Sequence, residues 1–136
     1  MKRTVLITGA TRGLGLFMAK AFAQAHYQVA LNYANNDEAA QAALSQVEAL
    51  GTAAIFKADV LTEDGVNHLI SEVTEKLGAP DTLVFNATPN QYQKSIEEQT
   101  TEDFASMSAA FMMSPHYLTR ATLPAMKKNK FGRIIN

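Results

Sequence analysis

The chain has 136 residues, a formal net charge of −1, 47% hydrophobic and 18% charged residues, and no cysteine. The length is enough for one domain with a buried core, and the composition is typical of a soluble globular protein. The small charge excludes a global attraction to nucleic acid or anionic lipid, and the lack of cysteine excludes disulfides and thiolate chemistry. No apolar run approaches the length of a membrane span or of a signal peptide, so we expect a cytoplasmic protein with no nucleic-acid or membrane partner.

Short apolar runs alternate with longer amphipathic patterns along the chain. Strands are predicted over residues 5–7, 28–33, 53–60 and 81–87, and a fifth begins in the final segment GRIIN. Helices are predicted over 13–25, 37–50, 62–77 and from 100 or 101 to about 128, with a loop over 89–99. The first helix is indicated by apolar residues at spacings of three and four, namely Leu14, Phe17, Met18, Ala21, Phe22 and Ala25. Thr62 and Thr100 or Thr101 are the expected N-caps.

Five strands that alternate with four helices predict an α/β fold. We expect residues 1–136 to form a single Rossmann-type domain with a doubly wound parallel sheet, covered by helices on both faces. Its crossover connections should be right-handed. Ligands of such sheets bind at the carboxyl ends of the strands, where the strand order reverses.

The first predicted strand ends in the glycine-rich stretch TGATRGLG, residues 8–15, in which a helix begins. A helix N-terminus presents unpaired N–H groups and a partial positive charge, and glycine lets a phosphate approach the backbone. The spacing of Gly9, Gly13 and Gly15 is G-x-x-x-G-x-G, which is neither the G-x-G-x-x-G fingerprint nor a P-loop. An ordinary strand-to-helix turn is the alternative interpretation.

Four segments, in order along the chain, resemble the short-chain dehydrogenase/reductase family, and most closely its 3-oxoacyl-[acyl carrier protein] reductases. TGATRGLG resembles the family's TGxxxGxG cofactor turn, and ADV (58–60) resembles its acidic-hydrophobic pair. NA (86–87) resembles the start of its N-A-G, and LPAMKKNKFGRIIN resembles the segment that leads into its fifth strand. The resemblance implies a nicotinamide cofactor, with Asp59 near its adenine. It implies cofactor contacts from Gly9, Thr11, Arg12, Gly13, Leu14, Gly15, Tyr33, Asp59, Val60, Asn86 and Ala87.

The residues after the second predicted strand favour NADP (NADPH) over NAD. NAD-binding domains place an acidic residue there to bind the ribose 2′-hydroxyl. Here residues 32–35 read Asn-Tyr-Ala-Asn, and the first carboxylate is Asp37, already in the predicted helix. Arg12 in the glycine turn is a candidate partner for a 2′-phosphate. A solvated surface arginine is the alternative.

The resemblance implies that the catalytic residues lie outside this chain. The family uses a Ser together with a Tyr that is followed four residues later by Lys. Neither Tyr27, Tyr33, Tyr92 nor Tyr117 has Lys four residues on, and the Ser would fall about three residues past Asn136. We therefore expect no catalytic residue within 1–136, and a five-strand sheet that is incomplete without a C-terminal remainder.

Two positions depart from the family pattern inside the chain. Thr88 replaces the glycine of N-A-G, and Phe111 occupies the expected position of the helix Asn that anchors a water relay. A phenylalanine side chain cannot hydrogen-bond to a water chain. Phe111 can alternatively be a core residue, because Phe104, Met107, Phe111 and Pro115 share one helix face.

The long predicted helix, 101–128, is the expected oligomer contact, because the family uses this helix in its dimer interface. Met112, Met113 and Tyr117 are candidates for contacts in a homo- or hetero-oligomer, with intramolecular core as the alternative. Pro115 removes one backbone donor and should kink the helix near Phe111.

The remaining polar residues carry weaker predictions. His26, His68 and His116 stand apart without ligand spacing, so we expect no metal site. Four cations lie within 127–133. They suit a solvated helix end, and the resemblance implies that Lys130 docks an acidic acyl carrier protein.

Two functions follow from these observations. The first is an NADPH-dependent reductase of a 3-oxoacyl thioester or a similar ketone, with this chain as its cofactor-binding part; the substrate is then a small molecule or is bound to a carrier protein. The second is a non-catalytic binding module or the inactive partner subunit of an active reductase, as Thr88 and Phe111 suggest. The fifth strand should leave an apolar edge exposed, so we expect residues 1–136 to fold poorly alone.

Overall fold

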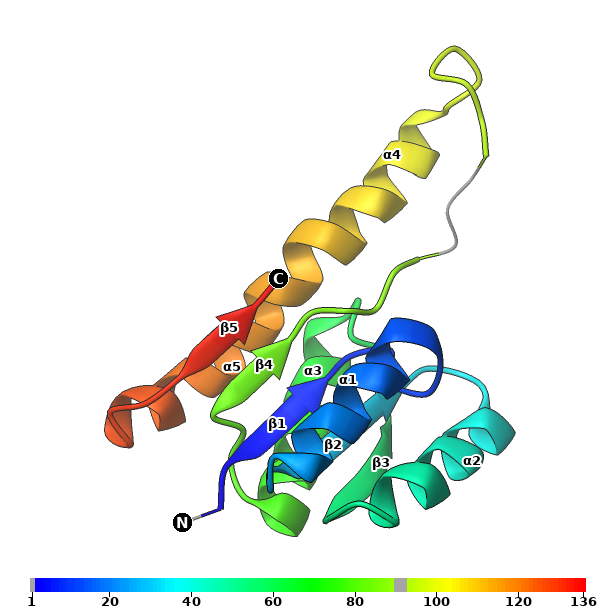
Figure 1. Cartoon of the computed structure of the whole chain (residues 1–136). Coiled ribbons are helices and arrows are strands. Elements are labelled where there is room, and N and C mark those ends of the chain that lie inside the picture. Colours follow the sequence, from blue (N-terminus) through cyan, green and yellow to red (C-terminus); the bar gives the residue numbers. More distant parts are fainter. Residues whose placement is uncertain (1, 90–92) are drawn as a thin grey trace.

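In the computed structural model, which describes residues 2–89 and 93–136, strands and helices alternate as predicted (Figure 1). Residues 90–92, which belong to the loop predicted over 89–99, lie outside the described residues. The elements are, in chain order, β1 (Thr4–Ile7), α1 (Gly13–Gln24), β2 (Gln28–Tyr33), α2 (Asp37–Glu48), β3 (Ala53–Lys57), α3 (Glu63–Leu77), β4 (Thr82–Val84), α4 (Thr101–Ser108), η1 (Ala109–Met113), α5 (Ser114–Lys128) and β5 (Arg133–Ile135).

The described strands form one parallel sheet with the order β3-β2-β1-β4-β5. The chain runs from β1 outward to β3 and then returns to the other side of β1 to form β4. The strand order therefore reverses between β1 and β4, which makes the carboxyl ends of these two strands the expected binding crevice of a doubly wound sheet. This arrangement confirms the predicted Rossmann-type α/β fold.

The core has two parts, one on each face of the sheet. Alternate residues of the central strands point to opposite faces, so β1 sends Val5 and Ile7 to one cluster and Leu6 to the other. The first cluster packs against α1 and α2, and the second against α3 and α5. Strands buried on both faces are continuously apolar, which is why the run in β1 shows no polar alternation.

Helix α1 packs close to the sheet through small residues. Its buried residues are Gly15, Ala19 and Ala23. Leu14 and Phe17, which help to predict this helix, are instead 66% and 71% exposed. The apolar spacing thus predicts the helix correctly, but the largest apolar side chains are not on its buried face.

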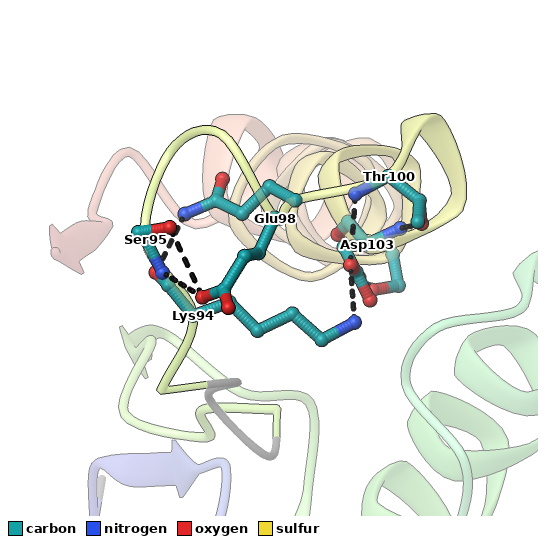
Figure 2. A network of polar contacts seen from close by, with 7 residues as sticks. Lys94, Ser95, Glu98, Thr100 and Asp103 are labelled. Carbon is teal, nitrogen blue, oxygen red and sulfur yellow. Dashed lines mark hydrogen bonds and ion pairs between the residues drawn. The ribbon is translucent and has the colours of Figure 1, made fainter.

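The predicted caps of α3 and α4 are confirmed. Thr62 Oγ1 accepts a hydrogen bond from the Gly65 N–H at 3.1 Å. At α4, Thr100 and Asp103 form a reciprocal capping box, and Lys94 Nζ donates to the Asp103 carboxylate at 2.7 Å (Figure 2). This network fixes the segment before α4 to the first turn of the helix.

The long helix predicted over 101–128 has three parts that follow one another as a single rod, which extends past the carboxyl ends of the strands (Figure 1). Its middle turn, η1, is a π-helix in which the Ser114 N–H donates to the Ala109 carbonyl. Pro115 follows directly and has no N–H to donate, so the predicted irregularity takes the form of a widened turn. Phe111 and Phe104, on the same predicted face, are 48% and 70% exposed, so the alternative interpretation of Phe111 as a core residue is wrong.

Met112, Met113 and Tyr117 are predicted to contact an oligomer partner or to belong to the intramolecular core, and they differ in burial. Met112 and Met113 are exposed in the single chain. Tyr117 is partly buried against the second core cluster, beside the fully buried Leu118. In the described ranges, no helix has both the length and the apolarity needed to cross a membrane.

Candidate functional site

The turn between β1 and α1 needs its glycines for two different reasons. Gly9 and Gly13 have φ angles of +62° and +52°, a conformation that favours glycine. A Cβ on Gly15 would collide with the Gly9 carbonyl and lie 2.6 Å from Asn86 Nδ2. At Gly13, by contrast, a Cβ would meet no heavy atom within 4 Å. The turn is therefore tightly packed at Gly15 and open at Gly13.

Residues that follow β4 hold this turn in place. Asn86 Nδ2 donates to the carbonyl oxygens of Thr8 and Gly9 at 3.1 and 3.0 Å. Thr8 Oγ1 accepts from the N–H groups of Asn86 and Ala87, both at 3.0 Å. Of these residues, Asn86 and Ala87 are predicted site residues, whereas Thr8 is not among the predicted contacts. In the sequence, Thr8 could have been found from its position as the first residue of TGATRGLG.

The N-terminus of α1 differs from the start of α2, α3 and α4. Those three helices have side-chain caps from Asn36, Thr62 and Thr100 and acidic residues in their first turns. Helix α1 follows Arg12, has no side-chain cap and has no acidic residue in its first turn. The partial positive charge of this helix end is therefore not offset by a side-chain cap or an acid, and its first residue, Gly13, leaves open space beside it, which suits an anionic group.

The ends of β2 and β3 are fixed beside the glycine turn. The Ala10 N–H donates to the Asn32 carbonyl at 3.0 Å. The buried Asn32 side chain donates to the carbonyls of Phe56 and Ala58 at 3.3 and 3.1 Å. The sequence TGATRGLG, the end of β2 and the segment after β3 therefore form one continuous edge.

A charged cluster lies at this edge. Asp37 begins α2 as predicted, but its carboxylate turns back toward β2, where Tyr33 Oη donates to it at 2.8 Å. Lys57 Nζ donates to the other carboxylate oxygen at 3.0 Å. The hydrogen bonds from Lys57 and then Tyr33 lower the pKa of Asp37, and the bond to Asp37 raises the pKa of the Tyr33 phenol. Sequence reasoning missed Lys57, because only the register Tyr33↔Lys57 brings it to Asp37.

The other predicted site residues lie around the same edge. Asp59 is exposed, and its carboxylate accepts a hydrogen bond from the Leu61 N–H at 2.9 Å, while Val60 is buried. Arg12 and Leu14 are exposed and Thr11 is half-buried. β3 ends at Lys57, so Asp59 and Val60 follow the strand rather than belonging to the predicted strand 53–60.

The two departures from the family pattern lie at different places. Thr88 is exposed and directly follows the clamped pair 86–87. Phe111 lies in η1, in the rod that extends past the sheet (Figure 1). Within residues 2–89 and 93–136, no group of three or more His, Cys, Asp or Glu side chains is placed to hold a metal ion.

Several curated proteins are similar in sequence to this chain. The 3-oxoacyl-[acyl-carrier-protein] reductases FabG of Staphylococcus epidermidis and Staphylococcus aureus are 31% and 33% identical to the whole chain, which covers 56% and 55% of their lengths. The D-beta-hydroxybutyrate dehydrogenase of Rhizobium meliloti is 31% identical, and the chain covers 53% of it. The chain thus spans about half the length of the curated relatives it matches.

Solved structures and a family model agree with these relatives. The crystal structure of a metagenomic short-chain oxidoreductase in complex with NADP superposes with a TM-score of 0.89 at 27% identity, over 98% of this chain and 61% of that one. A Serratia marcescens short-chain dehydrogenase/reductase mutant superposes with a TM-score of 0.87 at 26% identity, over 97% of this chain and 53% of that one. The family model described as short chain dehydrogenase matches residues 3–136. The chain therefore belongs to the short-chain dehydrogenase family of oxidoreductases.

Proposed function

We propose that the protein is an NADPH-dependent reductase of a 3-oxoacyl thioester or a similar ketone, and that residues 1–136 supply its cofactor-binding part. The observation that carries this proposal is the uncapped, acid-free N-terminus of α1 behind the open position at Gly13. The FabG relatives support the substrate class, and the solved relative in complex with NADP supports the cofactor.

The turn fits the pyrophosphate of a dinucleotide. A Cβ on Gly13, the first residue of α1, would meet no heavy atom within 4 Å, so there is open space beside this end of the helix. Asn86 and Thr8 keep the turn in one conformation. The turn therefore loses little conformational entropy when a dinucleotide binds. A bound nicotinamide cofactor would supply a hydride for the carbonyl carbon of the substrate.

Arg12 supports NADPH rather than NADH. Its side chain is exposed, and within the described part of the chain it has no hydrogen bond or ion pair. A guanidinium at the start of α1 is suited to a ribose 2′-phosphate, which it binds through charge-assisted hydrogen bonds.

Dissociation constants for NADPH and NADH test this choice. We expect tighter binding of NADPH, and we expect Arg12→Met to weaken NADPH binding about tenfold without a matching loss for NADH. Arg120→Met is the control, because Arg120 is equally charged, exposed and paired with Glu63 on the α3 side of the sheet. Tighter binding of NADH by the wild-type protein would contradict the proposal.

Activity separates the reductase from the alternative, a non-catalytic module or inactive partner subunit. That alternative is favoured by Thr88 and Phe111. The test is oxidation of NADPH by the protein in the presence of an acetoacetyl thioester. Turnover supports the reductase, whereas NADPH binding without turnover, unchanged by Phe111→Asn, supports the alternative.

We also infer that an acidic acyl carrier protein docks at Lys130. Lys130 is exposed, and with Lys127 and Phe131 it lines a shallow depression of about 340 Å³. Lys130→Glu should weaken binding of the carrier protein, because it reverses a charge on the contact surface. Lys20→Glu on α1 is the control. Equal affinities for wild type and Lys130→Glu would contradict this docking site.

We further propose that the rod of α4, η1 and α5 mediates oligomer formation. Phe104, Phe111, Met112 and Met113 are exposed on this rod. Large apolar side chains that are exposed on one element are typical of protein contacts.

A further inference from the structure

The cluster of Tyr33, Asp37 and Lys57 is not needed to hold the glycine turn. Tyr33 and Lys57 are neighbours in the β2–β3 register, and both donate to Asp37, the first residue of α2. The side chains of Lys57 and Asp37 are 51% and 67% exposed. The cluster is therefore accessible to a molecule bound along the carboxyl edge of the sheet.

Its place along this edge relates the cluster to the cofactor of the proposed function. The glycine turn follows β1, contacts the end of β2 through Ala10 and Asn32, and is followed along the sheet by the end of β3. A dinucleotide with its pyrophosphate on the turn and its adenine at Asp59 has its adenosine ribose between them, at the end of β2. The 2′ substituent of that ribose then lies beside the cluster of Tyr33, Asp37 and Lys57.

The net charge of the cluster determines whether it favours a 2′-hydroxyl or a 2′-phosphate. A free carboxylate at Asp37 would accept a hydrogen bond from a 2′-hydroxyl and repel a 2′-phosphate. Both oxygens of Asp37 already accept hydrogen bonds, and Lys57 cancels its charge. The pair of Asp37 and Lys57 is therefore neutral; without Lys57 it would carry a charge of −1.

We propose that Lys57 is a specificity-determining residue for NADP, which offsets the charge of Asp37 and donates a charge-assisted hydrogen bond to the 2′-phosphate. This inference rests on the proposed function. It also explains why a carboxylate so close to β2 is compatible with a phosphorylated ribose.

The test compares NADPH and NADH dissociation constants for the wild-type protein, Lys57→Met and Lys57→Arg. We expect Lys57→Met to weaken NADPH binding about tenfold and to leave NADH within about twofold, and Lys57→Arg to retain NADPH binding. Added Asp37→Asn should restore much of the NADPH affinity lost in Lys57→Met, because it removes the repelling charge. Lys20→Met, which removes the same charge from a lysine hydrogen-bonded to Gln46, is the control.

Salt gives a second readout that a purely structural role would not change. NADPH affinity should fall more steeply with ionic strength in the wild type than in Lys57→Met. If the wild type binds neither cofactor, the proposed function is wrong. If it prefers NADPH and Lys57→Met keeps the same preference and salt dependence, the role of Lys57 is wrong while the proposed function stands. A wild type that prefers NADH overturns both the NADP assignment and the role of Lys57.

Discussion

The side-chain amide of Asn86 donates to the main-chain oxygen of Gly9 at 3.0 Å, so the segment after β4 fixes the turn that follows β1. Asn86→Leu keeps the size of the side chain but leaves the carbonyls of Thr8 and Gly9 without this donor. We expect the free energy of unfolding to fall by about 2–3 kcal/mol, measured by urea denaturation. Asn67→Leu on the exposed face of α3 is the control, and an equal effect of both changes would argue against the clamp.

The glycines of the turn should differ in their tolerance of alanine. In Gly15→Ala the new Cβ meets the Gly9 carbonyl and the Asn86 amide. We therefore expect the free energy of unfolding to fall by about 2–3 kcal/mol. In Gly13→Ala the new Cβ meets nothing, and only the positive φ of +52° opposes it, at a cost of about 1 kcal/mol. Urea denaturation of the two variants measures this order, and the reverse order would show that the turn is packed differently.

The capping box of α4 predicts a pH-dependent contribution to stability (Figure 2). The hydrogen bond from Lys94, then that from the Thr100 N–H, lowers the pKa of Asp103 below its ordinary value of 3.8. A carboxyl group whose pKa is lower in the folded state stabilises the fold above its unfolded pKa, and this contribution is lost as the pH falls through the folded value.

We therefore expect Asp103→Ala to lower the melting temperature at neutral pH, with a difference from wild type that shrinks once the pH is below 3.8. Thermal unfolding followed by circular dichroism across this range measures it. Glu102→Ala, in the same helical turn, is the control. A difference that stays constant from pH 7 to acid would contradict the ionic contribution.

The outer edge of β5 predicts self-association. Ile134 and Ile135 are exposed, and β5 pairs with β4 on one side only among the described strands. Unpaired apolar edges of this kind promote aggregation, and lysine on an edge strand opposes it. Ile134→Lys should therefore reduce the concentration-dependent association of residues 1–136 in sedimentation velocity. Leu50→Lys, just after α2, is the control. A wild-type chain that stays monomeric would refute this prediction, and a monomer that also unfolds cooperatively would refute the expectation of poor folding alone.

The fold could be predicted from the sequence because its signals are local. Apolar runs and helical spacings lie within single elements, and a cap such as Thr62 lies three residues from the N–H that it accepts from. The turn at Gly9 to Gly15 was recognisable for the same reason. The hydrogen bonds from Asn86 to this turn were not predicted, because they depend on β4 lying beside β1 in the sheet.

The wrong and missed predictions concern residues whose exposure or partners are set by how other elements pack around them. The spacing of Phe104 and Phe111 indicates a core face, but the rod extends past the sheet and leaves them exposed (Figure 1). Phe17 is exposed because α1 approaches the sheet through Ala19 and Ala23. The ion pair between Asp37 and Lys57 depends on the β2–β3 register, which no spacing in the sequence records.

The separation of Thr8 and Asn86 in the chain also bears on how the protein is made. These partners are 78 residues apart, so at about 5–20 residues per second the ribosome adds Asn86 roughly 4–16 s after Thr8. During that interval the polypeptide contains every glycine of the turn and Asn32, whose carbonyl accepts from Ala10, but not the segment after β4 that binds Thr8 and Gly9. The turn in a nascent chain therefore gains its hydrogen bonds to Asn86 only after Asn86 has been translated, however early its glycines emerge.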